Sequence, residues 1–265
     1  MRKEHLEMLN AERAARRAVA LVTHLGTGEG IVVGRDGVPL TALRAPLPAS
    51  GERLVPDTET LKDGALSLTP LTGKGQDELR EALQSAFRTG KSGLVSVAGE
   101  AYFLNVHVPP TRLVVIGAVH ISQALAEMAR LVALDCTIID PRTAFATPER
   151  FPAVTLLAEW PQDVMPGLGI DAFTALVALT HDPKIDDPAL DIALKAGCFY
   201  IGALGSRKTH AARLTRLAAL GHGEAALAGI KAPIGLDIGA ISPAEIAVAV
   251  LGEIIAAMRL KPAAA

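Results

Sequence analysis

The stretch RLVVIGAVHISQALAEMARLVALDCTIID, residues 112–140, decides the fold. It contains two short apolar runs, which predict strands that end at Gly117 and Asp140. A strand, a helix and a second apolar strand in this order are typical of a parallel sheet covered by helices. The helix is predicted by apolar residues at helical spacing between the two runs: Ile121, Ala124, Leu125, Met128 and Val132.

The same alternation continues toward the C-terminus. Further apolar runs are AVTLLA, AFTALVALT and CFYIGALG, with a helix predicted at about 188–196 and a long one from Ser206. Ser242-Pro243-Ala244-Glu245 is a capping box, and the helix that follows it, 244–258, is apolar nearly all round and expected to be buried. Residues 109–265 therefore predict an α/β, Rossmann-like domain with a doubly wound parallel sheet.

Residues 1–108 have a different pattern and predict a smaller N-terminal α+β domain. The prolines Pro109-Pro110 separate it from the alternating region, since neither can continue a helix or a central strand. We expect a charged helix over 2–18, a strand over 18–24, a hairpin with Asp36-Gly37 as a turn signal, a helix over 76–89 and two strands. Residues 41–72, rich in Pro, Thr and Gly, receive no assignment.

Composition excludes several classes of protein. Half of the residues are hydrophobic, which excludes a disordered chain. A net charge of -2 and 3% aromatics do not suit nucleic-acid binding. No apolar run reaches 18 residues and the N-terminus is charged, so we expect no membrane segment, no signal peptide and a cytoplasmic location. Cys136 and Cys198 are predicted to be buried in two strands, and no Cys/His cluster suggests a zinc site.

The first strand–helix junction resembles a dinucleotide-binding loop only in part. Gly117 stands at the first glycine of the Gly-x-Gly-x-x-Gly pattern, but Val119 and Ser122 replace the second and third. Asp140 ends the second strand, near where an acid binds the ribose of a nicotinamide cofactor. The architecture is thus Rossmann-like, whereas NAD(P) binding is not favoured.

Two loops with an aspartate are each open to two interpretations. His181 and Asp182 follow a strand of the parallel sheet, where ligands bind in such folds. Asp182-Pro183 could equally be a turn with His181 as a loop histidine. Asp237 stands between Gly235 and Gly239, where it contacts a ligand or only satisfies loop N–H groups.

The stretch YIGALGSRKTH, 200–210, predicts an anion site. Gly202 and Gly205 would let the backbone turn, and Ser206 is a good N-cap. Arg207 and Lys208 would then lie in the first helical turn, where cations are unfavourable unless an anion occupies the free N–H groups. His210 and Arg213 follow at a spacing of three. The alternative is a solvated basic face on a helix that packs through Leu214 and Leu217.

Several long motifs resemble the XdhC/CoxI family of accessory proteins for xanthine dehydrogenase and related molybdenum hydroxylases. They cover residues 109–258 almost without a gap and include GAVHIS at 117–122, with His120, where the family has Gly-Ala-Gly-His-Val-Gly. The other motifs are IIDPRTAFATPERFP, LTHDPKIDDPAL, YIGALGSRKTHAARLTRLAALG and APIGLDIGAISPAEIAVAVLGEI.

The resemblance implies a cytoplasmic chaperone that binds the molybdenum cofactor, supports its sulfuration and passes it to the enzyme. The cargo would be a pterin bearing a phosphate or, in some bacteria, a nucleotide. Its implied partners are a cysteine desulfurase and an apo molybdenum hydroxylase of the xanthine dehydrogenase type, and the implied assembly is a homodimer. The cysteine that many members carry in the N-terminal domain is absent, because Cys136 is the first cysteine of this chain.

Three hypotheses follow. The leading one is a non-catalytic molybdenum cofactor chaperone with the site residues named above. The second is an NAD(P)-dependent oxidoreductase, suggested by the Rossmann-like pattern and Asp140. The third is a scaffold on which dehydrogenase subunits assemble.

Overall fold

The computed structural model describes residues 2–37, 39–40 and 73–260. The stretch 41–72, for which the sequence predicts no structure, lies outside these residues. The chain divides into two units, Met1–Pro109 and Pro110–Ala265, and each is described by itself.

The second unit is built on a parallel sheet of five strands in the order β7-β6-β5-β8-β9. This arrangement confirms the predicted fold class, an α/β Rossmann-like domain beside a smaller antiparallel one. The chain leaves the centre of the sheet twice, first toward β7 and then toward β9, which makes the sheet doubly wound. The strands are β5 (Arg112–Ile116), β6 (Asp135–Ile139), β7 (Thr155–Leu157), β8 (Thr174–Ala178) and β9 (Tyr200–Ala203).

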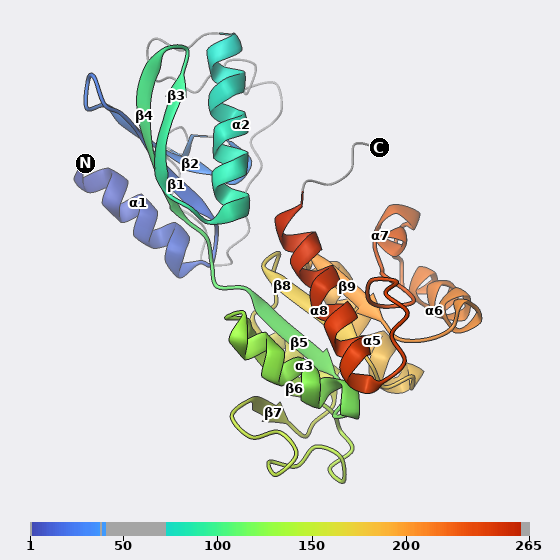
Figure 1. The fold of residues 1–265 in the computed structure, drawn as a ribbon. Coiled ribbons are helices and arrows are strands. Elements are labelled where there is room, and N and C mark those ends of the chain that lie inside the picture. The colour runs from blue at the N-terminus through green and yellow to red at the C-terminus, as the bar shows by residue number, and fades with distance from the viewer. Residues whose placement is uncertain (1, 38, 41–72, 261–265) are drawn as a thin grey trace. The chain divides into compact units, whose positions relative to one another are not determined.

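Helices cover both faces of this sheet. On β5, Leu113 and Val115 belong to the core under α3 and α8, whereas Val114 and Ile116 belong to the core under α5 and α6. Because successive side chains of a strand point to opposite faces, a strand covered on both faces must be apolar throughout. Figure 1 shows α3 and α8 packed together over one face. The helices are α3 (His120–Leu131), α5 (Pro183–Lys195), α6 (Arg207–Ala219) and α8 (Pro243–Arg259).

Two helix predictions are partly wrong. The helix expected near 188–196 begins at Pro183, because Asp182 caps it and proline suits the first helical position, where no N–H needs a partner. The last helix has the predicted capping box but is not buried all round, since Val248 is 51% exposed and only one face meets the core. Three shorter helical segments are α4 (Pro161–Val164), η3 (Met165–Leu168) and α7 (Glu224–Ala228).

The two cysteines differ from the prediction in one respect. Cys136 is buried in β6, but Cys198 is only half-buried and precedes β9 instead of lying in it. Burial raises the pKa of both thiols to about 12. Both are therefore protonated, weakly nucleophilic thiols at neutral pH.

The first unit holds an antiparallel sheet in the order β2-β1-β4-β3. Helix α1 packs against β1 and β2, and α2 packs against β3 and β4 (Figure 1). The helix predicted over 2–18 is shorter, because Arg16 has a positive φ of 51° that no helix continues. Asp36-Gly37 lies in a turn after β2. The elements are α1 (Lys3–Ala14), β1 (Val19–His24), β2 (Gly30–Gly34), α2 (Lys74–Thr89), β3 (Gly93–Val97) and β4 (Glu100–His107).

Two kinds of feature are absent from the residues that the structure describes. None of their helices is long and apolar enough to cross a membrane. Within the same residues, no group of three or more His, Cys, Asp or Glu side chains is arranged to hold a metal ion.

Candidate functional site

The carboxyl ends of β5 and β8 form the topological switch point of the parallel sheet. From β5 the chain runs through α3 to β6 on one side, and later returns to place β8 on the other side. In doubly wound folds, ligands bind at this point, beyond the carboxyl ends of the strands. The loops after β5, β6, β8 and β9 therefore define the candidate site.

Gly117 brings the loop after β5 against the loop after β8. Its φ is +113°, and a Cβ added to it would lie 2.9 Å from Cγ2 of Thr180. Only glycine fits both the backbone conformation and this close approach. Gly117 thus serves the packing of two loops, whatever it contributes to a ligand.

Asp140 is fully buried beneath the same loop. Its carboxylate accepts hydrogen bonds from the Ala118 N–H at 2.7 Å and from the Arg142 guanidinium at 2.7 and 2.9 Å. Burial alone would raise the pKa of Asp140, but the hydrogen bonds from Arg142 and Ala118 outweigh it and hold the pKa below its usual value. The carboxylate that would bind a ribose in a dinucleotide fold is here occupied by the protein itself.

Ser122 explains how the loop closes without its third glycine. The side chain is fully buried, and its hydroxyl donates to the Gly117 carbonyl and accepts from the Val119 N–H at 3.4 Å. A serine therefore supplies loop contacts where a dinucleotide-binding protein has a glycine that lets the helix pack closely.

Asp186 organises the loop after β8. Its carboxylate is 1% exposed and accepts hydrogen bonds from the Thr180 hydroxyl at 2.7 Å and from the His181 N–H at 3.1 Å. The His181 side chain is exposed, and its φ is +63°. Asp182 caps α5 through the Lys184 N–H at 2.9 Å, so it belongs to a helix start rather than to a free turn. Sequence reasoning missed Asp186, which only tertiary contacts distinguish from its acidic neighbours.

The start of α6 carries most of the predicted anion site. Ser206 is the N-cap and accepts from the Thr209 N–H at 3.2 Å, while Arg207 and Lys208 are exposed in the first turn. Gly205 has a φ of +140° and forms the turn before the helix. The first-turn N–H groups of Arg207 and Lys208 are donors that no helical carbonyl can reach.

Gly202 does not take part in that turn, contrary to the prediction. It lies inside β9, and a Cβ added to it would lie 2.6 Å from both Cδ1 of Ile234 and the hydroxyl of Tyr200. The residue is a glycine because two side chains pack onto its Cα. It therefore has no role in bending the backbone.

The remaining predicted residues, His120 and Asp237, are exposed and separate. His120 begins α3, next to the glycine loop. Asp237 lies in the loop before α8, which is tied to that helix by the Leu236 N–H and the Ala249 carbonyl at 3.1 Å. Within the described part of the chain, no hydrogen bond or ion pair joins Asp237 to the four loops of the candidate site.

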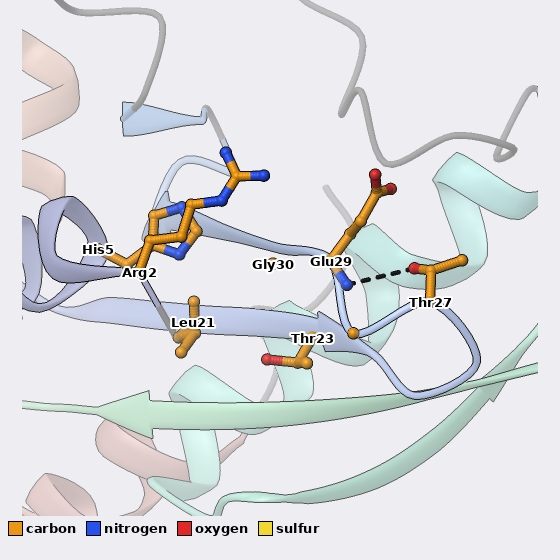
Figure 2. A pocket seen from close by; sticks show the side chains of 8 residues that line it. Arg2, His5, Leu21, Thr23, Thr27, Glu29 and Gly30 are labelled. Carbon is orange, nitrogen blue, oxygen red and sulfur yellow. Dashed lines mark hydrogen bonds between the residues drawn. The ribbon is translucent and has the colours of Figure 1, made fainter.

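The first unit contains a small pocket of about 170 Å³. Figure 2 shows Arg2 and His5 at one end of it and Thr27 and Glu29 at the other, with Leu21 and Thr23 on β1 between them. Its lining mixes both signs of charge, and none of the predicted site residues lies in it. The carboxyl edge of the parallel sheet remains the candidate site.

These features define a protein with a Rossmann domain whose dinucleotide fingerprint is replaced by side-chain contacts. Residues 113–254 match the family model of the XdhC Rossmann domain, and the chain belongs to that family. The predicted resemblance is thereby confirmed.

Three curated relatives are similar to this chain. It is 34% identical over 172 residues to the uncharacterized protein YqeB of Escherichia coli, covering 63% of this chain and 31% of that protein. It is 33% identical over 152 residues to the molybdenum cofactor insertion chaperone PaoD of Escherichia coli, covering 57% and 41%. It is 32% identical over 148 residues to a probable xanthine dehydrogenase subunit of Bacillus subtilis, covering 56% and 43%. The matches thus span less than half of each relative.

One solved structure has the same overall arrangement. It is described as a xanthine dehydrogenase from Bacillus halodurans, and it matches 98% of this chain and 97% of its own with a TM-score of 0.52. Because the two sequences are 18% identical, this likeness shows the fold alone.

Proposed function

We propose that this protein is a chaperone that binds the molybdenum cofactor and delivers it to a molybdenum hydroxylase of the xanthine dehydrogenase type. Membership of the XdhC family and similarity to a molybdenum cofactor insertion chaperone support the general role. In this proposal the chain catalyses no reaction itself, and the first unit is a divergent XdhC/CoxI-type domain. The cytoplasm and a homodimeric state are further parts of the proposal.

The observation that carries the proposal is the start of α6 at the carboxyl edge of the sheet. There the Gly205 turn, the Ser206 cap and the cations Arg207 and Lys208 surround free backbone N–H groups. Such a helix start binds phosphate groups through its N–H donors and its dipole. We assign it the phosphate, or nucleotide phosphate, of the pterin cofactor. His120, His181 and Asp237 would contact other parts of the same cargo.

Sulfuration of the cofactor is proposed to depend on a partner. Both thiols of the chain have a pKa raised to about 12, so neither supplies the thiolate that would carry sulfur. A cysteine desulfurase acting on the bound cofactor is the partner that this chemistry requires.

The test measures binding of purified full-length protein to the molybdenum cofactor and, separately, to NAD⁺ and NADP⁺. We expect cofactor binding and transfer, seen as activation of a cofactor-free xanthine dehydrogenase-type enzyme. Binding of NAD(P) without the cofactor would replace the proposal by an oxidoreductase. Binding of neither would leave an assembly scaffold. Light scattering of the same preparation tests the homodimer.

A further inference from the structure

Arg213 is a buried cation whose hydrogen-bonding capacity is only partly used. It lies on α6 and is 2% exposed. Its Nη2 donates to the Leu204 carbonyl at 3.0 Å, but Nε and Nη1 have no hydrogen-bond partner among the described residues. Buried polar groups are nearly always hydrogen-bonded, because an unmade bond leaves the loss of hydration uncompensated. A buried guanidinium with two free donors therefore indicates a missing acceptor.

Asp186 is too engaged to be that acceptor. The closest approach of its carboxylate to Arg213 is 3.8 Å, because its oxygens already bind the Thr180 hydroxyl and the loop N–H groups. Burial lowers the pKa of Arg213, although Asp186 acts in the opposite direction. The positive charge of Arg213 is thus incompletely balanced within the described part of the protein.

The free donors lie under the predicted phosphate turn. Helical side chains lean toward the N-terminus of their helix, which brings Arg213 beneath Leu204-Gly205. Its Nη2 lies 3.9 Å from the place that a Cβ on Gly205 would occupy. One turn nearer the helix start, His210 also has a buried ring nitrogen, Nδ1, without a partner in the described chain. Two unpartnered polar groups on adjacent turns of the helix therefore lie close to the same turn.

We propose that an oxyanion of the phosphate class, bound in the turn 204–209, completes the coordination of Arg213, with His210 as a second donor. The inference rests on the proposed function in taking the phosphate-bearing cofactor as the natural ligand. Nε and Nη1 are covered from solvent, so the turn opens to admit the anion. Arg213 then recognises the anion in a desolvated setting, where a charged hydrogen bond is strong. The exposed Arg207 and Lys208 attract it but are screened by water and salt.

The experiment titrates the full-length chain with inorganic phosphate and with pyrophosphate, followed by calorimetry and ³¹P NMR. R213M should weaken binding about 10- to 100-fold, the usual range for a hydrogen bond to a charged group. R216M is the matched control, because Arg216 lies on the same helix but is already paired with Asp187. Equal affinity of R213M and the wild type, or no phosphate binding by the wild type, overturns the inference.

R213M leaves Asp186 buried without its cation and could unfold the chain, so a second variant is needed. The double variant D186N/R213M removes both charges together. If it folds with a wild-type circular dichroism spectrum and still loses phosphate binding, the loss belongs to Arg213. Wild-type affinity in this variant overturns the inference.

The same variants separate this inference from the proposed function. If the molybdenum cofactor binds the wild type and D186N/R213M equally well, Arg213 is not the anion residue, and the chaperone proposal stands. If phosphate binding depends on Arg213 but the molybdenum cofactor does not bind, the anion site stands, and the chaperone proposal fails.

Discussion

The Asp140 carboxylate accepts a hydrogen bond from the Ala118 backbone N–H, with 2.7 Å between the two atoms. This bond joins the end of β6 to the loop after β5, and Arg142 completes it by pairing with the same carboxylate. The loop is therefore held by an internal anion at the place where dinucleotide folds bind a ribose hydroxyl. We regard this substitution as the main physical reason to expect weak NAD(P) binding.

Asp140→Asn should lower the free energy of unfolding by about 3 kcal/mol at pH 7, because it leaves Arg142 without its buried partner. The lowered pKa of Asp140 gives the wild type a stability term that is fully present above the unfolded pKa of about 4. The term is lost as the pH falls through the lower folded pKa. Urea unfolding between pH 2 and 7 measures this slope.

The slope should be reduced in D140N and retained in D237N, which changes an exposed aspartate. An unchanged pH dependence in D140N would show that Asp140 does not supply the term.

Gly117→Ala should destabilise the fold by about 2 kcal/mol, since alanine is strained at a φ of +113° and its Cβ meets Thr180. T180S removes the contacting methyl group and keeps the hydroxyl that binds Asp186. The cost of G117A should therefore be smaller in the T180S background but not zero. Equal costs in both backgrounds, measured by thermal unfolding, would remove the steric part of the argument.

Replacing Arg207 and Lys208 together by alanine should weaken binding of phosphate-bearing ligands by roughly two- to tenfold, as expected for exposed charges. The weakening should diminish as salt is added, because salt screens exposed charges. Calorimetry at two ionic strengths measures both effects. R130A/K195A removes the same charge at the ends of α3 and α5 and should bind normally. Equal losses in both double variants would mean a general charge effect.

Gly202→Ala should destabilise the second unit by about 2 kcal/mol, because the new methyl group overpacks Ile234 and Tyr200. Shortening Ile234 to alanine in the same chain should return part of the loss by making room. Urea unfolding of the single and double variants provides the measurement. A stable G202A that loses only ligand binding would instead restore the turn role predicted from the sequence.

Local patterns were sufficient for much of the fold. The apolar runs of β5, β6, β8 and β9 predicted buried parallel strands, because a strand covered on both faces needs apolar residues at every position. Caps were equally predictable, since Ser206 and Ser242 each bind an N–H three residues ahead. Boundaries failed where a residue has two local meanings, as Asp182-Pro183 did: the pair starts a helix as readily as it forms a turn.

The candidate site was predictable in place but not in its internal contacts. The sequence by itself determined a Rossmann-like domain, the loops at its carboxyl edge and the cationic start of α6, because all of these follow from spacing within a few residues. Only the tertiary structure decided that Asp140 binds Ala118, that Gly117 touches Thr180 and that Asp186 faces Arg213. These pairs are more than 20 residues apart in the chain. Their contacts depend on the strand order and on how two loops approach each other, which no local pattern encodes.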